Sequence, residues 1–279
     1  MTNAPDPLVA AVVQMCARQD IDANLATASA LCEQAVARGA NLLVLPENYP
    51  YIGRLGDKAA MAERLETPGK VLTHAAELAR RWGAYLLAGG VATRDDAIDA
   101  AHFYNTALLY DGQGELVAAY RKIHLFDVAI PDGAEFQESA HVTAGAEVVC
   151  APVGAATLGL SICYDLRFPE LYRQLARRGA EVVAVPAAFT LHTGKDHWLP
   201  LLRARAIENQ VYVLAAGQHG RHTKQRVSYG KSCIIDPWGM VVAQASDGDG
   251  VAIAELDLER VARVRRELPC MQHARLLGD

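Results

Sequence analysis

"RGANLLVLPE", residues 38–47, has a close counterpart in "RGAEVVAVPA", residues 178–187. In each, a glycine typical of a helix C-terminus precedes a short apolar run and a proline. A second pair, "YNTALLYDGQG" (104–114) and "YGKSCIIDPWG" (229–239), places Tyr, Asp and Gly at equal spacing around a predicted hairpin turn. Both pairs occur in the same order along the chain. We therefore expect two similar halves related by pseudo-two-fold symmetry, each with one sheet faced by helices.

Short runs rich in Val, Ile, Leu and Ala predict buried strands, and helical periodicity lies between several of them. The predicted strands are 8–14, 42–46, 85–91, 104–110, 115–120, 157–162, 182–186, 211–216, 231–236, 240–244 and 251–255. The predicted helices are 22–38, 70–82, 168–178, 196–209 and 258–266, with Pro200 in the first turn of the fourth. This mixture predicts an α/β layered fold. No compositional linker divides the chain, so we expect a single domain over residues 1–279.

Composition excludes several classes of protein. The 279 residues carry a net charge of -5, with 51% apolar and 21% charged residues, as in an ordinary soluble globular protein. The mild acidity gives no reason to expect nucleic acid or a membrane as a partner. No apolar run reaches the roughly 20 residues that span a bilayer. The first apolar stretch lacks a preceding basic segment, which favours a strand over a signal peptide.

The cysteines, histidines and glycines match no cofactor motif. The six cysteines contain no C-x-x-C pair, which argues against a zinc ribbon, and a disulfide framework is not expected in a chain of this length. The histidine spacing fits no metal pattern, and no nucleotide-binding glycine motif is present. We therefore expect a cytoplasmic protein with reduced thiols, and neither a metal nor an organic cofactor.

Three charged residues stand where chemistry is commonly placed. Glu47 follows a predicted buried strand, at the end where α/β sheets form ligand crevices, and partial burial there is expected to raise its pKa toward that of a general base. Lys122 follows the returning strand of the first hairpin in an apolar segment, which suits an ammonium that stabilises an oxyanion. Glu138 is the candidate partner that keeps this lysine charged. From position alone, each also fits an ordinary solvated charge.

Cys163 ends the apolar run of "LSICYDLRFPELY" (160–172), at a predicted strand-to-helix corner. The layout resembles a nucleophile elbow, although G-x-S-x-G is absent. We expect the corner to expose the sulfur, and the helix beginning near 168–169 to point its first amides back toward it. Positive charge from Lys122 would favour the thiolate. A structural buried cysteine is the alternative interpretation.

Together, "LPENY", "RKIHLFDV", "QES" and "SICYDLRFPELY" resemble the nitrilase superfamily of carbon–nitrogen hydrolases, and the similarity runs from about residue 8 to 275. The resemblance implies a four-layer α-β-β-α sandwich and a homodimer formed through helices. It also implies a catalytic triad of Glu47, Lys122 and Cys163, assisted by Glu138.

Within that superfamily, "GQHGRHTKQRVSYGKS" (217–232) and "VRRELPCMQHARL" (264–276) are most similar to the branch of deaminated-glutathione amidases. In that branch, the residues matching Tyr49, Arg167 and Thr193 are associated with an α-keto acid end of the substrate. This chain departs from the usual pattern at Asp196, next to Lys195, and at Ala274, where alanine and arginine are usual. The basic loop of Arg221, His222, Lys224 and Arg226 is either an ordinary solvated loop or a site for a distal carboxylate.

The reaction that the resemblance implies passes through a thioester. Glu47 takes the proton of Cys163 as sulfur attacks an amide carbonyl, and Lys122 and the backbone N–H of Tyr164 hold the oxyanion. Glu47 then protonates the departing ammonia and activates the water that frees the acid. The leading prediction is hydrolysis of deaminated glutathione. The alternatives are an ω-amidase for α-ketoglutaramate or a related small amide, and a dimeric scaffold without catalysis.

Overall fold

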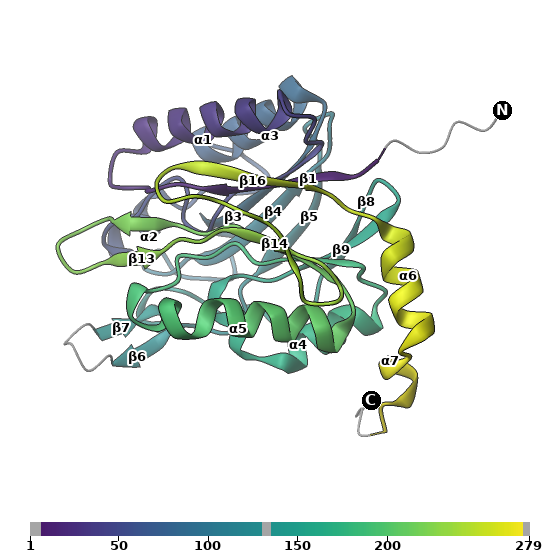
Figure 1. The fold of residues 1–279 in the computed structure, drawn as a ribbon. Helices are drawn as coiled ribbons and strands as arrows, with labels where there is room; N and C mark the ends of the chain where they lie inside the picture. Colours follow the sequence, from purple (N-terminus) through teal and green to yellow (C-terminus); the bar gives the residue numbers. More distant parts are fainter. Residues whose placement is uncertain (1–6, 130–134, 276–279) are drawn as a thin grey trace.

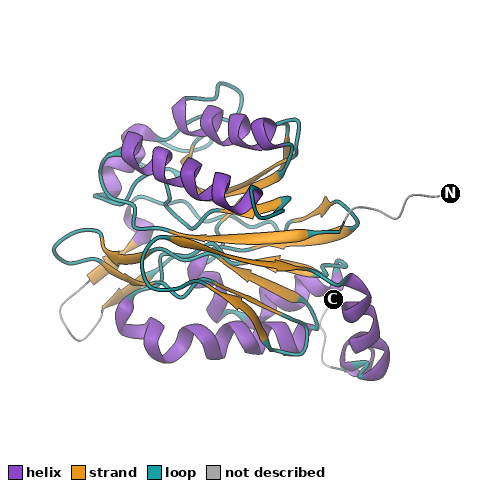
Figure 2. Ribbon diagram, turned by 45° about the horizontal axis from the view of Figure 1, so that its top comes forward, coloured by secondary structure: helices purple, strands orange, loops and turns teal. Residues whose placement is uncertain are grey.

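The computed structural model describes residues 7–129 and 135–275. Two six-stranded sheets face each other in the middle of the molecule, and helices cover their outer faces (Figures 1 and 2). Helices α1 (Ile21–Val36) and α3 (Lys70–Trp82) lie over the first sheet, and α4 (Pro169–Arg177) and α5 (Leu191–Asn209) lie over the second. The four-layer α-β-β-α sandwich expected from the sequence is therefore confirmed.

The remaining elements are short or lie at the periphery. The other helices are α2 Leu55–Met61, α6 Leu258–Glu267 and α7 Cys270–His273, with 3₁₀ turns η1 Glu138–Ala140 and η2 Cys163–Arg167. The first sheet consists of β1 Val9–Gln14, β2 Leu42–Val44, β3 Tyr85–Thr93, β4 Tyr104–Tyr110, β5 Leu116–Arg121 and β16 Gly250–Glu255. The second consists of β8 Cys150–Val153, β9 Ala156–Leu160, β10 Val182–Ala184, β11 Tyr212–Ala215, β14 Cys233–Ile235 and β15 Val241–Gln244. Two ribbons, β6 Asp127–Ala129 with β7 Glu135–Gln137 and β12 His219–Arg221 with β13 Val227–Tyr229, stand apart.

The two sheets repeat one another strand by strand. Their orders are β16-β1-β2-β3-β4-β5 and β8-β9-β10-β11-β14-β15, and in both the successive pairings are antiparallel, parallel, parallel, antiparallel and antiparallel. The paired hairpins also match in detail. The Asp111 carboxylate accepts the backbone N–H groups of residues 113 and 115, and the Asp236 carboxylate accepts those of residues 238 and 240. The two similar halves expected from the sequence are thus present.

The strands read as continuous apolar runs because both of their faces are covered. Side chains alternate across a strand, so in β1 Ala10 and Val12 point into the core between the sheets, whereas Ala11 and Val13 pack beneath α1 and α3. A run without alternation is the expected sequence pattern for such a strand. None of the helices in the described ranges is long and apolar enough to cross a bilayer.

The sequence-based helix at 196–209 was placed too late. Helix α5 begins at Leu191, because the Thr190 side chain caps its first turn by accepting the backbone N–H of Thr193. Pro200 consequently lies inside the helix and not in its first turn. Burial of Trp198 and Leu202 against the second sheet holds the helix together across the proline.

Candidate active site

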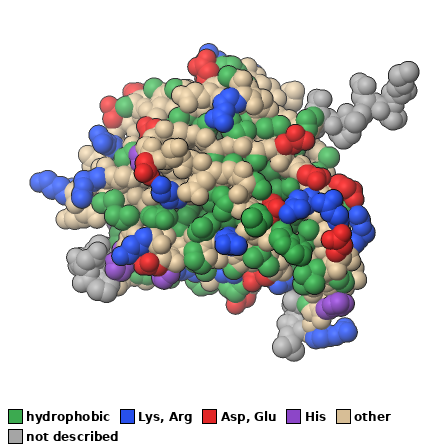
Figure 3. Space-filling model, viewed as in Figure 1, with side chains coloured by type: hydrophobic (Ala, Val, Ile, Leu, Met, Phe, Trp, Pro, Cys, Tyr) green, Lys and Arg blue, Asp and Glu red, His purple; other side chains and the backbone are tan. Residues whose placement is uncertain are grey.

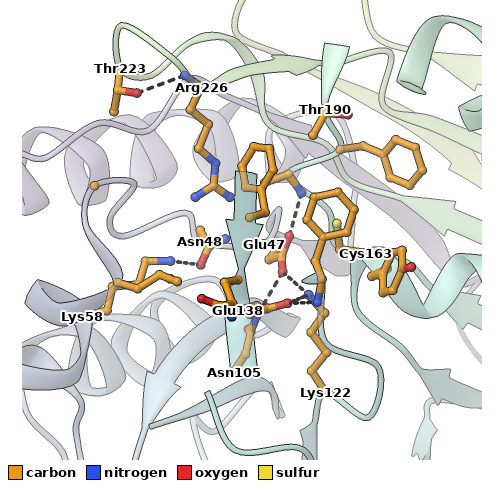
Figure 4. A pocket seen from close by; sticks show the side chains of 18 of the residues that line it. Glu47, Asn48, Lys58, Asn105, Lys122, Glu138, Cys163, Thr190, Thr223 and Arg226 are labelled. Atoms are coloured by element: carbon orange, nitrogen blue, oxygen red, sulfur yellow. Dashed lines mark hydrogen bonds and ion pairs between the residues drawn. The ribbon is translucent and has the colours of Figure 1, made fainter. Parts of the chain in front are cut away.

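A cavity of about 520 Å³ opens where the carboxyl ends of β2, β9 and β10 meet. Both halves of the chain line it: Glu47, Asn105 and Lys122 come from the first sheet, and Cys163 and Ala188 come from the second. The volume is that of a typical small-molecule site. The strand-end positions of the predicted residues thus converge on one pocket, although they are far apart in the chain (Figure 4).

Lys122 is buried between two carboxylates. Its Nζ lies 2.7 Å from Glu138 Oε2 and 3.3 Å from Glu47 Oε1, and the lysine is only 2% exposed. The Asn105 side-chain amide bridges the same two carboxylates, at 2.9 Å from Glu47 and 3.2 Å from Glu138. Burial alone lowers the pKa of a lysine, but the Glu138 and Glu47 carboxylates hold that of Lys122 above its usual value. Lys122 is therefore a fixed positive charge in the pocket.

Cys163 sits at a strained corner after β9. Its φ is 48°, a left-handed value that non-glycine residues seldom adopt, and its backbone N–H donates to the Pro186 carbonyl at 2.9 Å. The chain turns directly into η2, which begins at Cys163 itself. The helix expected near residues 168–169 is α4, which begins at Pro169, and η2 lies between it and the corner. The partly buried cysteine lines the pocket.

Glu47 and Cys163 shift one another's pKa. Burial would raise the pKa of Glu47, but Lys122 and a hydrogen bond from Cys163 lower it to about 2. Burial and the neighbouring Glu47 raise the pKa of Cys163 well above its usual value, and they outweigh Lys122. The expectation of a raised Glu47 pKa was therefore wrong. Lys122 favours the thiolate, as expected, but less strongly than burial and Glu47 oppose it. The pair rests as a carboxylate and a thiol.

A buried carboxylate joins the lysine segment to the cysteine corner. Asp165 accepts hydrogen bonds from the Tyr120 hydroxyl at 2.7 Å and from the Ile162 backbone at 2.8 Å. Its other oxygen lies 3.1 Å from the His124 backbone nitrogen and 2.7 Å from its Nδ1. Since His124 follows Lys122 by two residues and Asp165 follows Cys163 by two, this contact fixes the ammonium relative to the sulfur.

Glu47 is held in place from several sides. Its Oε2 accepts the backbone N–H of Ala188 at 2.9 Å, from the loop that corresponds to its own in the second half. Gly90, at a φ of 61° in the irregular middle of β3, lies against it, and a Cβ there would stand 2.6 Å from Glu47 Cγ. Only glycine combines that backbone conformation with that close approach.

The residues predicted to contact substrate are only partly brought together. Tyr164, Arg167 and Thr193 line the pocket, and Arg167 lies over the Phe189 ring at 5.0 Å. Tyr49 does not line it. Its ring is completely buried in the core beneath α1 and α3, so its expected contact with substrate is wrong. The turn after Glu47 directs the Tyr49 side chain into the core and away from the pocket.

The structure also places the basic loop and the two departures from the family pattern relative to the pocket. Arg226 lines the pocket, whereas Arg221 and Lys224 of the same basic loop are exposed and outside its lining. Asp196 is exposed on α5, and Ala274 follows α7, so neither departure from the family pattern changes the pocket walls of this chain. Within the described residues, no cluster of three metal-ligating side chains occurs.

Sequence reasoning missed Asn105, Asn48 and Lys58, which all line the pocket. Asn105 lies within an apolar strand, where a lone amide is a weak signal. Asn48 adopts a φ of 61°, and its side-chain oxygen accepts a hydrogen bond from the Lys58 ammonium. Lys58 belongs to the short helix α2, which the apolar periodicity did not predict. A lysine within "GDKAAM" gives no sign of burial.

The chain matches the family model described as "Carbon-nitrogen hydrolase" over residues 9–266. It is 45% identical to a deaminated glutathione amidase of Synechocystis sp., over 96% of this chain and 98% of that protein. Its structure matches that of the Caenorhabditis elegans NitFhit protein with a TM-score of 0.90 and 41% identity, over 98% of this chain and 66% of the other. It also matches Saccharomyces cerevisiae Nit3, a member of the nitrilase superfamily, with a TM-score of 0.84 and 31% identity, over 94% of each chain.

Proposed function

The chain belongs to the carbon–nitrogen hydrolase family, and on that premise we propose that it hydrolyses deaminated glutathione through a thioester on Cys163. The observation that carries the mechanism is the meeting of Glu47, Lys122 and Cys163 in one cavity. The substrate is the one named for the Synechocystis relative, which is similar over nearly the whole of both chains.

In the first half of the proposed reaction, the sulfur attacks the amide carbonyl while Glu47 takes the thiol proton. The resting carboxylate–thiol pair suits this step, because the base is ionised and already hydrogen-bonded to the acid. The negative charge passes to the carbonyl oxygen beside the Lys122 ammonium. The backbone N–H of Tyr164 is a second donor, since first-turn amides have no acceptor within their own helix.

In the second half, protonated Glu47 gives its proton to the leaving nitrogen, and the tetrahedral intermediate collapses to the thioester. The expected release of ammonia applies only to a primary amide and is wrong for deaminated glutathione. Both amides of this compound are secondary, so the bond next to the keto acid end releases cysteinylglycine as a free amine. Glu47 then deprotonates water, which attacks the thioester and frees 2-oxoglutarate and the thiol.

The keto acid end is assigned to Arg167. Its guanidinium lines the pocket four residues after the nucleophile, and Nη1 lies 3.2 Å from His197 Nδ1. A planar guanidinium can bind a carboxylate through two parallel hydrogen bonds. Its guanidinium carbon lies 5.9 Å from the centre of the Tyr164 ring and 5.0 Å from that of the Phe189 ring, and these contacts orient the group.

Steady-state assays test the substrate. We expect kcat/KM for deaminated glutathione to exceed that for α-ketoglutaramate by at least about tenfold, because only the longer compound fills the cavity. The products, 2-oxoglutarate with cysteinylglycine or with ammonia, are separated by mass spectrometry. Equal values would favour a general ω-amidase. The absence of any product or Cys163 adduct with either compound would favour a scaffold without catalysis.

We further propose that the protein acts as a homodimer, as expected from the family resemblance. Exposed apolar side chains gather where α5 meets the β14–β15 hairpin. These are Ile207, Trp238, Met240 and Val242, each 47–54% exposed. Figure 3 shows hydrophobic side chains collected over this region. A patch of this kind favours an interface between copies.

Light scattering coupled to size exclusion tests this assembly. We expect a dimer for the wild type and a monomer for Trp238→Glu, because a charge at the centre of an apolar interface stays unpaired. Leu116→Glu is the matched control, since Leu116 is also exposed but lies beside the corresponding hairpin of the first sheet. A monomeric wild type, or a dimeric Trp238→Glu variant, would contradict the proposed interface.

We also propose a reducing, cytoplasmic setting. All six cysteines are free thiols, and the proposed nucleophile requires a reduced sulfur. Cell fractionation tests this, and recovery of the protein with secreted markers would contradict it.

A further inference from the structure

Two cations line the pocket and have no role in the chemistry. Lys58, on α2, is only 6% exposed, and Arg226 comes from the loop between β12 and β13. In Figure 4 the Arg226 guanidinium reaches down toward Asn48, and Lys58 reaches the same asparagine from the side. The Lys58 ammonium donates to the Asn48 side-chain carbonyl, which is a neutral partner. The two positive groups therefore face one end of the cavity.

Glu47 acts on both cations, but only from beyond ion-pair distance. Within residues 7–129 and 135–275, no carboxylate lies within ion-pair distance of Lys58 or Arg226. Lys122, in the same pocket, is paired with two. Burial and the nearby Arg226 lower the pKa of Lys58 to about 7. An unpaired charge is costly to bury, so this end of the cavity is suited to an anion.

We propose that Lys58 and Arg226 together bind the terminal carboxylate of the leaving-group half of the substrate. The inference rests on the proposed function, because deaminated glutathione carries one carboxylate at each end. Arg167, oriented by its contacts with the Tyr164 and Phe189 rings, serves the keto acid end. Lys58 lies across Glu47 from Cys163 in Figure 4. A substrate that binds Arg167 with one carboxylate and Lys58 and Arg226 with the other then has its scissile amide next to the Cys163 sulfur.

The test compares two substrates and two enzymes. Deaminated glutathione is matched with the same compound ending in glycinamide, which lacks only the terminal charge. We expect wild type to prefer the carboxylate form by about 10- to 100-fold in kcat/KM, mainly through KM, as for a hydrogen-bonded charge pair. Lys58→Met and Arg226→Gln should reduce this preference to less than about threefold, and Lys58→Arg should restore most of it.

Lys224→Met is the matched control, because it removes a cation from the same loop but outside the pocket lining. It should keep the wild-type preference. Wild-type turnover of both compounds without discrimination, or Lys58→Met and Arg226→Gln variants that still discriminate, would overturn this inference alone. Absence of turnover by a folded wild type would overturn the proposed function and this inference with it.

A pH series separates binding by Lys58 from a structural role. The charged groups that act on Lys58 are Arg226, Glu47, Glu138 and Lys122, and the lowered pKa leaves it protonated below about 7 and neutral above. KM for the carboxylate form should therefore rise with pH above about 7 in the wild type. Arginine stays charged, so Lys58→Arg should lack this rise. Identical pH profiles for the two enzymes would overturn the role of Lys58.

Discussion

Replacing Cys163 by alanine is expected to lower kcat by a factor of about 10⁴ or more, because the covalent route then disappears. The remaining groups, Glu47 and Lys122, could polarise the carbonyl, but no nucleophile would stand at the corner. The fold should persist, since the sulfur is only partly buried and a smaller side chain fits the same φ no worse. Product formation is measured by mass spectrometry under saturating substrate.

The thioester itself provides the second measurement. Intact-protein mass spectrometry should find an acyl adduct on the wild type during turnover and none on Cys163→Ala. Cys150→Ala is the matched control, because Cys150 is also partly buried but lies on β8, outside the pocket. It should retain full activity. A Cys163→Ala variant with more than about 1% of wild-type activity would refute the covalent mechanism.

Replacing Glu47 by glutamine is expected to cost about 10³- to 10⁵-fold in kcat, because one carboxylate serves as base in both halves of the reaction. The substitution keeps the shape of the side chain. Ala188 and Asn105 donate to different oxygens of Glu47, and glutamine keeps only one acceptor oxygen, so some loss of thermal stability should accompany it. Alkylation of Cys163 by iodoacetamide should also slow, since the thiol loses its base.

The pH dependence of kcat provides a second test of the role of Glu47. The pKa of Glu47 is held at about 2 and that of Cys163 lies well above its usual range, so the carboxylate–thiol pair does not titrate between them. Wild-type kcat should therefore be nearly level from about pH 5 to 8. Glu138→Gln is the comparison, because Glu138 contacts Lys122 and not the thiol. A Glu47→Gln variant that loses less activity than Glu138→Gln would contradict the assignment of the base.

Local sequence signals were sufficient for most of the sandwich. Strands with both faces covered are uniformly apolar, and glycine marks helix ends, so β2 and β10 and the helices before them were predicted. Helices α2 and α7, strand β8 and the ribbons β6–β7 and β12–β13 were not. Each of these elements has seven residues or fewer, which is too short for a local pattern to identify.

The same division applies to the site. Glu47, Lys122 and Cys163 follow strands, and strand ends can be read from the sequence. The protonation states of these residues could not be predicted, because they depend on the loss of water and on charges 41 to 179 residues away along the chain. Tyr49 shows the same limit, since one turn of the backbone decides whether a ring faces the cavity or the core.

The sequence by itself determined most of the strands, the paired hairpins and the candidate nucleophile, because backbone periodicity and turn chemistry are local properties. Only the tertiary structure decided that the thiol rests protonated, that Asp165 fixes the lysine segment to the cysteine corner, and that Lys58 is a buried cation hydrogen-bonded to the neutral Asn48 side chain. These depend on which groups share a dry cavity, and electrostatic energy in such a cavity is set by distance in space and not along the chain.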